Sequence, residues 1–385
     1  MAIVIISVTL LATTVLSVSR MAPAHASTSD SARAAAHWMA AQVQPDGSVI
    51  DPYSSLPSVD WAVNVALGLA ATGTEPEALA RAMSYIDANV MAYVNGGTSD
   101  VVGRYSWLTL LASALGRDAR SFGAANTDLI AGIESRWEVS ESAVFGAIDP
   151  YTPVTNQALA ILALLSAGEP EPTAAIQWLV DQQCASPSAS TGAWQGYRAR
   201  FATVPVSCSA AASGNLTGPD VNSTSFAVQA LVLVQRLSTS NGWDAAIDGS
   251  ALPAADAWLR SIQVGSGQGV GGFGQTLGDA GDPNSTAVAI MMIRSLSQDP
   301  GSAAWMAGGV TPLDSLIEWQ IASGGEAGAF ASPWSAGFAD LYATYQSLWG
   351  GAGAVLPIVM PIADPVPSSS STSEIELTVA PSFTG

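Results

Sequence analysis

The sequence contains no lysine, and its charged side chains are few. Of its 385 residues only 11% are charged, all twelve basic residues are arginine, and 31 acidic residues give a formal net charge of −19. Without lysine, Schiff-base chemistry and a Walker-type phosphate loop are excluded. Because phosphate binding needs a clustered basic face, we expect no nucleic-acid partner.

Histidine and cysteine are also scarce. His37, beside Trp38, is the one histidine beyond residue 26. No nucleophile motif such as Gly-x-Ser-x-Gly accompanies it, so we interpret it as a surface side chain. Cys184 and Cys208 are the only cysteines. In an oxidising compartment they would form a disulfide worth roughly 3 kcal/mol, whereas without export they would be free thiols. We predict no metal site and no cofactor.

The N-terminus is apolar from residue 2 to residue 19, and Ala24-His25-Ala26 follows. Small residues on both sides of a cleavage position predict a signal peptide over residues 1–26 and a secreted or cell-surface protein. Arg20 follows the apolar run, and no basic residue precedes it. An uncleaved anchor or a misassigned start codon is therefore the alternative. No later stretch is long and apolar enough to cross a membrane.

Pairs of helical segments fill most of the chain. Each pair joins a mixed helix with an aromatic residue near Gln or Glu, as in Gln177-Trp178 and Trp319-Gln320, to a helix of almost only Ala, Leu, Val and Ile. The six expected pairs are Ala32–Gln42 with Ala62–Ala71, Leu79–Val94 with Tyr105–Leu115, Asp128–Trp137 with Asn156–Ala167, Pro172–Gln183 with Ser223–Leu237, Ala254–Gln263 with Ser285–Leu296, and Pro312–Ile321 with Ala339–Trp349.

This repeat predicts an all-α fold, an (α/α)6 toroid of six helical hairpins over residues 31–350. A helix that is apolar on every side should be buried, so the second helices form the inner ring and the first helices the outer ring. An open superhelix is the competing geometry. The inner helices run in one direction, and their N-terminal ends should meet at one mouth. Residues 351–385, rich in Pro and Ser, are predicted to be a disordered linker or tail.

Two inner helices begin with nearly the same residues, Asp220-x-Asn222-Ser223-Thr224 and Asp282-x-Asn284-Ser285-Thr286. These side chains can cap a first helical turn. Together with the six hairpins, they resemble the prenyltransferase and squalene-cyclase repeat superfamily. That superfamily includes terpene cyclases, protein prenyltransferase β subunits and cobalamin carriers. The resemblance implies the α/α toroid.

Several functional groups of the superfamily have no counterpart in this sequence. Class II terpene cyclases protonate their substrate with the middle Asp of an Asp-x-Asp-Asp motif, and Asn222 and Asn284 occupy that position here. An amide is not a general acid, so we expect no cyclase activity. The zinc ligands of the prenyltransferases are not matched. The cobalamin carriers pair the toroid with a β domain that closes over the ligand. Since the sequence ends just after its linker, we do not expect corrinoid binding.

Side chains near the expected mouth and in the cysteine loop are the candidate site. Aromatic and amide groups bind sugars or apolar rings, and Arg binds carboxylates. The candidate ligand-binding residues are Asp60, Trp61, Tyr105, Trp107, Trp194, Tyr197, Arg198, Asn222 and Asn284. The cysteine loop either packs on the rim or forms a lid.

We therefore expect a secreted, non-catalytic toroid that binds a small molecule, a glycan or a cell-envelope component at the mouth. One alternative is a polysaccharide hydrolase or lyase that uses Asp220, Asp282 and Tyr197, since paired carboxylates cleave glycosidic bonds. Others are a cyclase- or prenyltransferase-like enzyme, a cobalamin carrier, and a structural module of the cell envelope.

Overall fold

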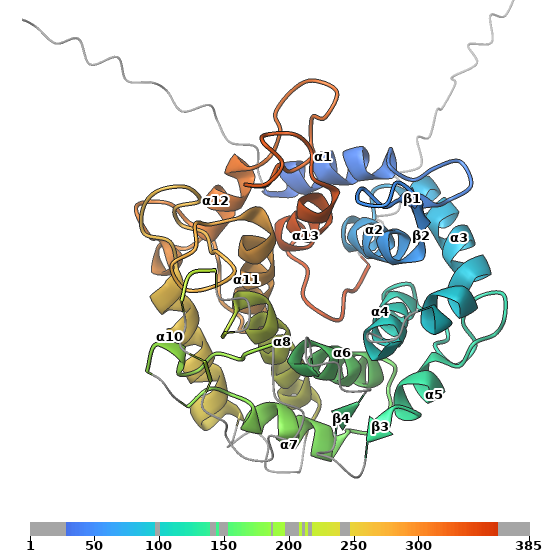
Figure 1. Cartoon of the computed structure of the whole chain (residues 1–385), viewed down its shortest axis with the longest axis horizontal. Helices are drawn as coiled ribbons and strands as arrows, with labels where there is room; N and C mark the ends of the chain where they lie inside the picture. Colours follow the sequence, from blue (N-terminus) through green and yellow to red (C-terminus); the bar gives the residue numbers. More distant parts are fainter. Residues whose placement is uncertain are drawn as a thin grey trace, which may run out of the picture.

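The computed structural model describes residues 28–96, 101–138, 144–145, 153–185, 188–196, 208–209, 212–214, 218–238 and 247–360. Within these ranges twelve α-helices form two concentric rings (Figure 1). The outer helices are α1 (Thr28–Ala40), α3 (Pro76–Asn95), α5 (Leu129–Glu134), α7 (Thr173–Asp181), α10 (Leu252–Ile262) and α12 (Pro312–Glu318). The inner helices are α2 (Val59–Thr72), α4 (Val101–Ala114), α6 (Pro153–Ser166), α8 (Val221–Leu237), α11 (Pro283–Ser295) and α13 (Leu341–Gly351). The six predicted hairpins and the (α/α)6 toroid are confirmed.

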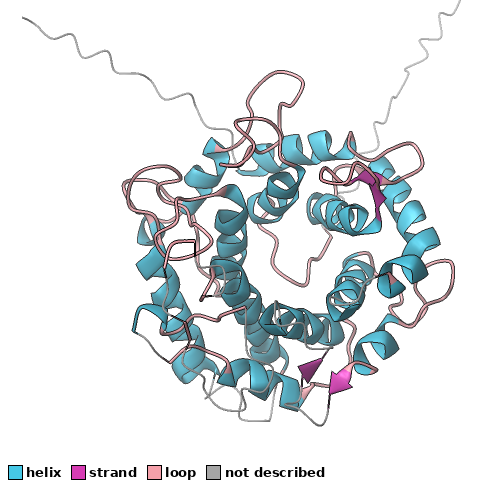
Figure 2. Ribbon diagram, in the orientation of Figure 1, coloured by secondary structure: helices cyan, strands magenta, loops and turns pink. Residues whose placement is uncertain are grey.

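Strands are confined to two short antiparallel pairs in the described part of the chain. β1 (Val49–Ile50) pairs with β2 (Pro57–Ser58), and β3 (Trp137–Glu138) pairs with β4 (Val144–Phe145). Figure 2 shows both pairs outside the inner ring. Three short irregular helices, η1 (Ser188–Ser190), η2 (Ile247–Ala251) and η3 (Ala303–Trp305), lie in the connections.

The inner ring is closed. Each inner helix contacts the next, and α13, the last, contacts α2, the first. Burial follows the predicted pattern, since every residue of α11 from Pro283 to Ile293 is buried. None of the helices in the described part of the chain has the length and apolar character needed to cross a bilayer.

A glutamine that follows each of the last three outer helices joins consecutive repeats. Its side-chain Nε2 donates one hydrogen bond to a glycine carbonyl in its own loop and another to a backbone carbonyl of the next repeat. The donors and acceptors are Gln183 with Gly192 and Ala251, Gln263 with Gly271 and Trp305, and Gln320 with Gly328 and Ser31. Since Ser31 lies in α1, the third glutamine joins the last repeat to the first.

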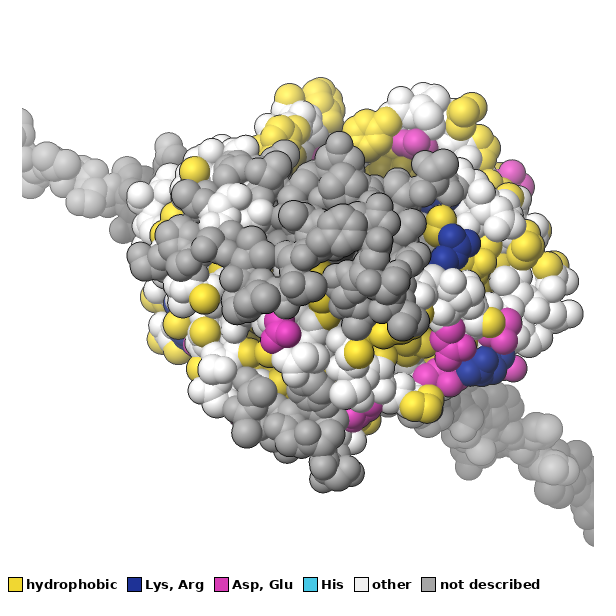
Figure 3. Space-filling model, turned by 60° about the horizontal axis from the view of Figure 1, so that its bottom comes forward, with side chains coloured by type: hydrophobic (Ala, Val, Ile, Leu, Met, Phe, Trp, Pro, Cys, Tyr) yellow, Lys and Arg dark blue, Asp and Glu magenta, His cyan; other side chains and the backbone are white. Residues whose placement is uncertain are grey.

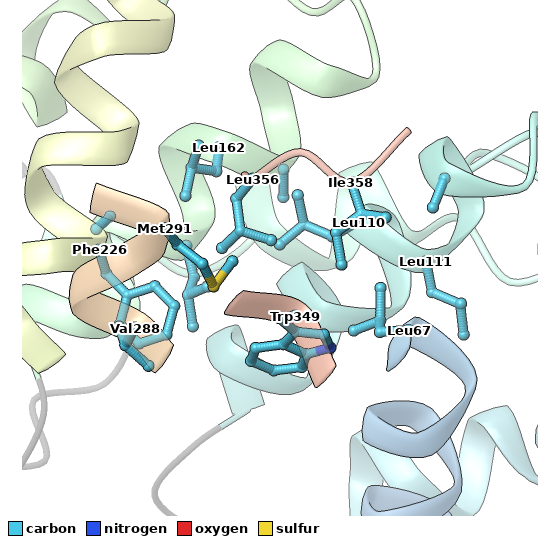
Figure 4. Packing of buried hydrophobic residues seen from close by; sticks show 14 of the residues in the cluster. Leu67, Leu110, Leu111, Leu162, Phe226, Val288, Met291, Trp349, Leu356 and Ile358 are labelled. Carbon is cyan, nitrogen blue, oxygen red and sulfur yellow. The ribbon is translucent and has the colours of Figure 1, made fainter. Parts of the chain in front are cut away.

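The segment after α13 enters the centre of the ring (Figure 1). Leu356 and Ile358 are buried, and the backbone N–H of Leu356 donates to Gln229 Oε1 at 2.9 Å. Figure 4 shows the two side chains among Leu110, Leu162 and Met291 of three inner helices. Composition placed residues 351–360 in the linker, but their described side chains include part of the core.

Candidate functional site

The mouth of the ring is the end at which the inner helices begin. Because outer and inner helices alternate, all inner helices point the same way and their first turns meet there. Side-chain caps set four of these starts: Ser58, Asp220, Asp282 and Asp340 each accept a hydrogen bond from a backbone N–H of the first turn. The second residues of these four helices are Asp60, Asn222, Asn284 and Tyr342.

The two carboxylates of the hydrolase alternative are buried helix caps. Asp220 Oδ1 accepts the N–H of Ser223 at 2.7 Å, and its Oδ2 accepts the N–H of Gly196 at 3.3 Å. Asp282 Oδ1 accepts the N–H of Ser285 at 2.8 Å. Loss of hydration on burial raises the pKa of each of the two carboxyls to about 6, although these hydrogen bonds oppose the shift. Capping therefore accounts for both side chains.

An unbroken chain of aromatic rings runs from the rim of the mouth into the centre of the ring. Consecutive ring centroids lie between 5.2 and 6.2 Å apart along Tyr53, Trp61, Tyr345, Trp349, Trp107 and Phe226. Tyr342 contacts both Trp61 and Tyr345. Tyr53 is 81% exposed, whereas Trp349 is buried, so the chain connects solvent with the core.

The side chains of two predicted site residues pack inside the fold and do not face the mouth. The ring of Tyr105 packs against Gly132 of the outer helix α5, where a β-carbon would meet it at 2.2 Å. Trp194 is fully buried, and its indole donates to Leu179 O at 2.8 Å. Its backbone N–H donates to Thr224 Oγ1, as those of Phe273 and Phe330 donate to Thr286 and Thr344, so Trp194 is a structural anchor of its repeat. Tyr197 and Arg198 lie outside the described residues.

The cysteine loop is covalently closed. Cys184 and Cys208 form the predicted disulfide, with Cα atoms 5.5 Å apart. The described residues beyond Cys208 are held by the following repeat: Asp279 accepts hydrogen bonds from Ser213 Oγ at 2.6 Å and from the Gly214 N–H at 2.9 Å. Part of the loop is therefore attached beside the start of α11.

Sequence reasoning missed the aromatic residues of α13 and the partner of Asp60. Tyr342, Tyr345 and Trp349 are spaced by three and four residues, which places them on one helix face. That spacing was visible in the sequence. The hydroxyl of Tyr93 donates to Asp60 Oδ1 at 2.7 Å, whereas Asp60 is exposed on its other side. Tyr93 comes from the outer helix α3, and no local pattern links it to Asp60.

Tyrosine and carboxylate groups influence one another at this position. Burial raises the pKa of Tyr345 well above its ordinary value, and the negative charge of Asp60 contributes. The pKa of Asp51 is lowered, first by the backbone N–H of Tyr53 and then by the hydroxyl of Ser54. The ionised form of Asp51 and the neutral form of the Tyr345 hydroxyl are therefore favoured.

Amide groups in the first turns of two inner helices have unused hydrogen-bonding capacity. Asn284 is 5% exposed, and neither its Oδ1 nor its Nδ2 has a partner. Asn222 Oδ1 is also buried without a partner. Asn284 lies one helical turn before Val288, which Figure 4 shows in the central cluster, so its side chain leaves the helix toward the centre. An unpaired buried amide costs about 1–3 kcal/mol, so a partner from outside the fold, water or a ligand, would stabilise these atoms.

In Figure 3 acidic and basic side chains occupy little of the described surface, and most of them lie on the right of the view. Three surface pockets lie away from the aromatic chain. One, of about 480 Å³, adjoins Trp137 and Glu171, another of about 290 Å³ adjoins Arg236 and Asp256, and a third of about 320 Å³ adjoins Arg117. No three His, Cys, Asp or Glu side chains in the described part of the chain come together as a metal ion would require.

No family model and no curated protein matches the sequence. Solved structures do match. An α-1,6-mannanase of Salegentibacter sp. with bound α-1,6-mannotriose has a TM-score of 0.55 at 11% identity, over 85% of this chain and 98% of its own. The unsaturated glucuronyl hydrolase of Bacillus sp. GL1 has a TM-score of 0.57 at 14% identity, over 84% and 96%.

A third similar structure is the type II terpene cyclase MstE of Scytonema with its product merosterolic acid A. Its TM-score is 0.53 at 15% identity, over 85% of this chain and 96% of that one. At these identities the similarity concerns the fold. The chain shares the α/α-toroid fold with glycan hydrolases and with a terpene cyclase, which confirms the architecture implied by the squalene-cyclase resemblance.

Proposed function

We propose that the protein binds a small-molecule ligand at the mouth of the ring and does not transform it. The observation that carries this proposal is Asn284, a buried amide in the first turn of α11 with two unpartnered polar atoms. The same ring of helices holds an aromatic chain that reaches solvent. Aromatic faces supply contact area, and a few convergent polar groups fix the orientation of a ligand. A ligand hydroxyl could accept a hydrogen bond from Asn284 Nδ2 or donate one to its Oδ1, whereas a ligand ether or carbonyl could only accept from Nδ2.

The net negative charge of the protein restricts the classes of ligand that can bind. The net charge of −19 and the absence of lysine disfavour an anionic ligand, since the field of the whole protein repels it. Neutral and cationic ligands remain. The carboxylates of Asp220 and Asp282 are occupied as helix caps, which supports binding without catalysis.

The test is a ligand panel on the full chain, read by tryptophan fluorescence and thermal unfolding. The panel contains α-1,6-mannotriose, geranylgeraniol and choline, with product analysis by mass spectrometry. We expect at least one member to bind unchanged. Asn284→Ala should weaken that binding at least tenfold while leaving the free energy of unfolding unchanged or up to about 1 kcal/mol higher, because an unpaired amide is removed.

Trp334→Ala is the matched control. Trp334 is a 73% exposed tryptophan that makes none of the ring contacts of the aromatic chain, so its loss should leave binding intact. If no member of the panel alters the fluorescence or the melting temperature, or if Asn284→Ala binds as well as the unmodified protein, the proposal is wrong.

A second candidate is glycan hydrolysis centred on Asp60. This carboxylate is exposed at the mouth and accepts a 2.7 Å hydrogen bond from the Tyr93 hydroxyl. Such a hydrogen bond would hold a general acid or base in position. Two of the similar structures are glycan hydrolases by name. Release of reducing ends from a glycan panel, abolished in Asp60→Asn but kept in Asp51→Asn, would establish this candidate in place of the first.

A further inference from the structure

Three rings at the mouth stand nearly perpendicular to one another. The ring of Trp61 makes angles of 84° with Tyr342 and 75° with Tyr345, and the two tyrosines are inclined at 71°. Their centroids lie 6.3, 5.9 and 5.3 Å apart in the same order. Tyr53 adds a fourth ring 6.2 Å from Trp61. We name Tyr53, Trp61, Tyr342 and Tyr345 the aromatic corner.

The aromatic corner still presents ring surface to solvent. Tyr53 is 81% and Tyr342 37% exposed, so the four rings do not cover one another completely. Rings that pack only to fill a core would be buried, as Phe273 and Trp305 are. Where a ring face is uncovered, it carries the negative pole of the aromatic quadrupole and attracts cations within about 6 Å of the ring centroid.

Carboxylates surround the aromatic corner. Asp60 precedes Trp61 in the chain and is exposed, Asp51 accepts the N–H of Tyr53 at 2.8 Å, and Asp340 caps the helix that carries the two tyrosines. The arginines that lie over aromatic rings in the described part of the chain do so at Tyr93, Phe122 and Trp305. The protein thus supplies negative charge and aromatic rings at the corner. The described cation–π contact of Arg104 with Tyr93 adjoins Asp60 but involves none of the four rings.

We propose that the aromatic corner binds an organic cation of the quaternary-ammonium class. Such a cation has no N–H to donate, so it gains more from ring faces than from hydrogen bonds. Several rings set at right angles can contact it from different sides at once. The carboxylates and the net charge of −19 draw it toward the mouth. This inference rests on the proposed function and specifies the class of its ligand.

Comparing choline with 3,3-dimethylbutan-1-ol distinguishes the contribution of charge to binding from that of shape. The two molecules have the same shape, but only choline is charged. Titration calorimetry on the full chain should show choline binding at least tenfold more tightly. Trp61→Ala should reduce choline affinity at least tenfold, and Asp60→Asn should reduce it several-fold and weaken its dependence on salt. Trp334→Ala should leave it unchanged.

The far-ultraviolet circular dichroism and melting temperature of Trp61→Ala establish whether that variant folds. If it does not, Tyr53→Ala serves in its place, since Tyr53 is at the surface. Equal affinity for the alcohol and for choline, or choline binding that survives loss of Trp61 and Tyr53, would overturn the inference. If α-1,6-mannotriose or geranylgeraniol binds but choline does not, the inference is wrong and the proposed function stands. If none of the four ligands binds, both the inference and the proposed function are wrong.

Discussion

The side-chain Nε2 of Gln320 donates a 2.8 Å hydrogen bond to the backbone carbonyl of Ser31, 289 residues away in the sequence. The same nitrogen donates to Gly328 O at 2.8 Å. The seam of the toroid, where the last repeat meets the first, is therefore joined by the device that joins earlier repeats. No covalent bond closes the ring at this position, so its integrity depends on such contacts.

Loss of this glutamine should loosen the seam. We expect Gln320→Ala to lower the free energy of unfolding by about 1–3 kcal/mol, because two partly buried carbonyls lose their donor. Gln177→Ala is the control. Gln177 bonds only Asp181 one turn away on an exposed surface, and its loss should cost less than about 0.5 kcal/mol. Urea denaturation measures both, and equal costs would contradict the role of Gln320.

Two glycines of one loop allow the cost of a left-handed backbone conformation to be measured separately from the cost of a steric clash with α1. Gly328 and Gly324 have similar φ of +95° and +90°, but a β-carbon on Gly328 would lie 2.3 Å from Ala34 O, whereas Gly324 has open space. Gly324→Ala should cost about 1 kcal/mol for its backbone alone. Gly328→Ala should cost about 1–3 kcal/mol more because α1 must move away. Similar losses in denaturation of the two variants would show that the approach of α1 is not tight.

The buried cap Asp282 should make stability depend on pH. Its pKa is about 6 in the folded chain against an ordinary value of 3.8, so the folded state binds the proton more tightly than the unfolded state. Stability from this group is therefore present at low pH and is lost as the pH rises from about 4 through about 6, by up to about 3 kcal/mol. Asp282→Asn keeps an oxygen for the Ser285 N–H and should make this part of the curve of unfolding free energy against pH less steep, leaving the contribution of Asp220.

Asp220 gives the matched comparison. Its two oxygens accept from Ser223 and from Gly196, and an asparagine has one oxygen to offer. At pH 7.5 Asp220→Asn should be about 1–3 kcal/mol less stable than Asp282→Asn, because one buried N–H loses its acceptor. Denaturation of both variants in the same buffer checks this, and an Asp282→Asn curve as steep as that of the unmodified protein would contradict the assigned pKa.

The segment after α13 should contribute to stability. Leu356→Ala is expected to cost about 2–5 kcal/mol, since a buried leucine in the centre of the ring is truncated. Val359→Ala, three residues on and 81% exposed, should cost less than about 0.5 kcal/mol. Thermal unfolding of the two variants measures both costs. If Leu356→Ala unfolds at the same temperature as the unmodified protein, the segment does not contribute to the stability of the ring.

The elements were predictable where their signals are local. Asp220 and Asp282 precede apolar runs and do cap α8 and α11, and Gly73 ends α2 with a left-handed φ of 65°. The repeat count then gave the toroid, because each apolar helix needs neighbours on all sides.

The site was predictable only in part. Trp61 and Trp107 belong to the aromatic chain, but Tyr105 does not. Residues two apart on a helix point about 200° away from each other, so Tyr105 and Trp107 cannot both face the centre. The pairing of Trp61 with Tyr342 and Tyr345 depends on ring closure across most of the chain, and no local pattern encodes it. The burial of Leu356 likewise depends on the finished ring, whereas its composition is that of a linker.

The aromatic corner takes Tyr53 and Trp61 from the first repeat and Tyr342 and Tyr345 from the last. A molecule bound between them would contact both the first and the last repeat of the toroid. Its binding free energy would add to the free energy needed to separate these two repeats, so ligand binding would stabilise the closed ring.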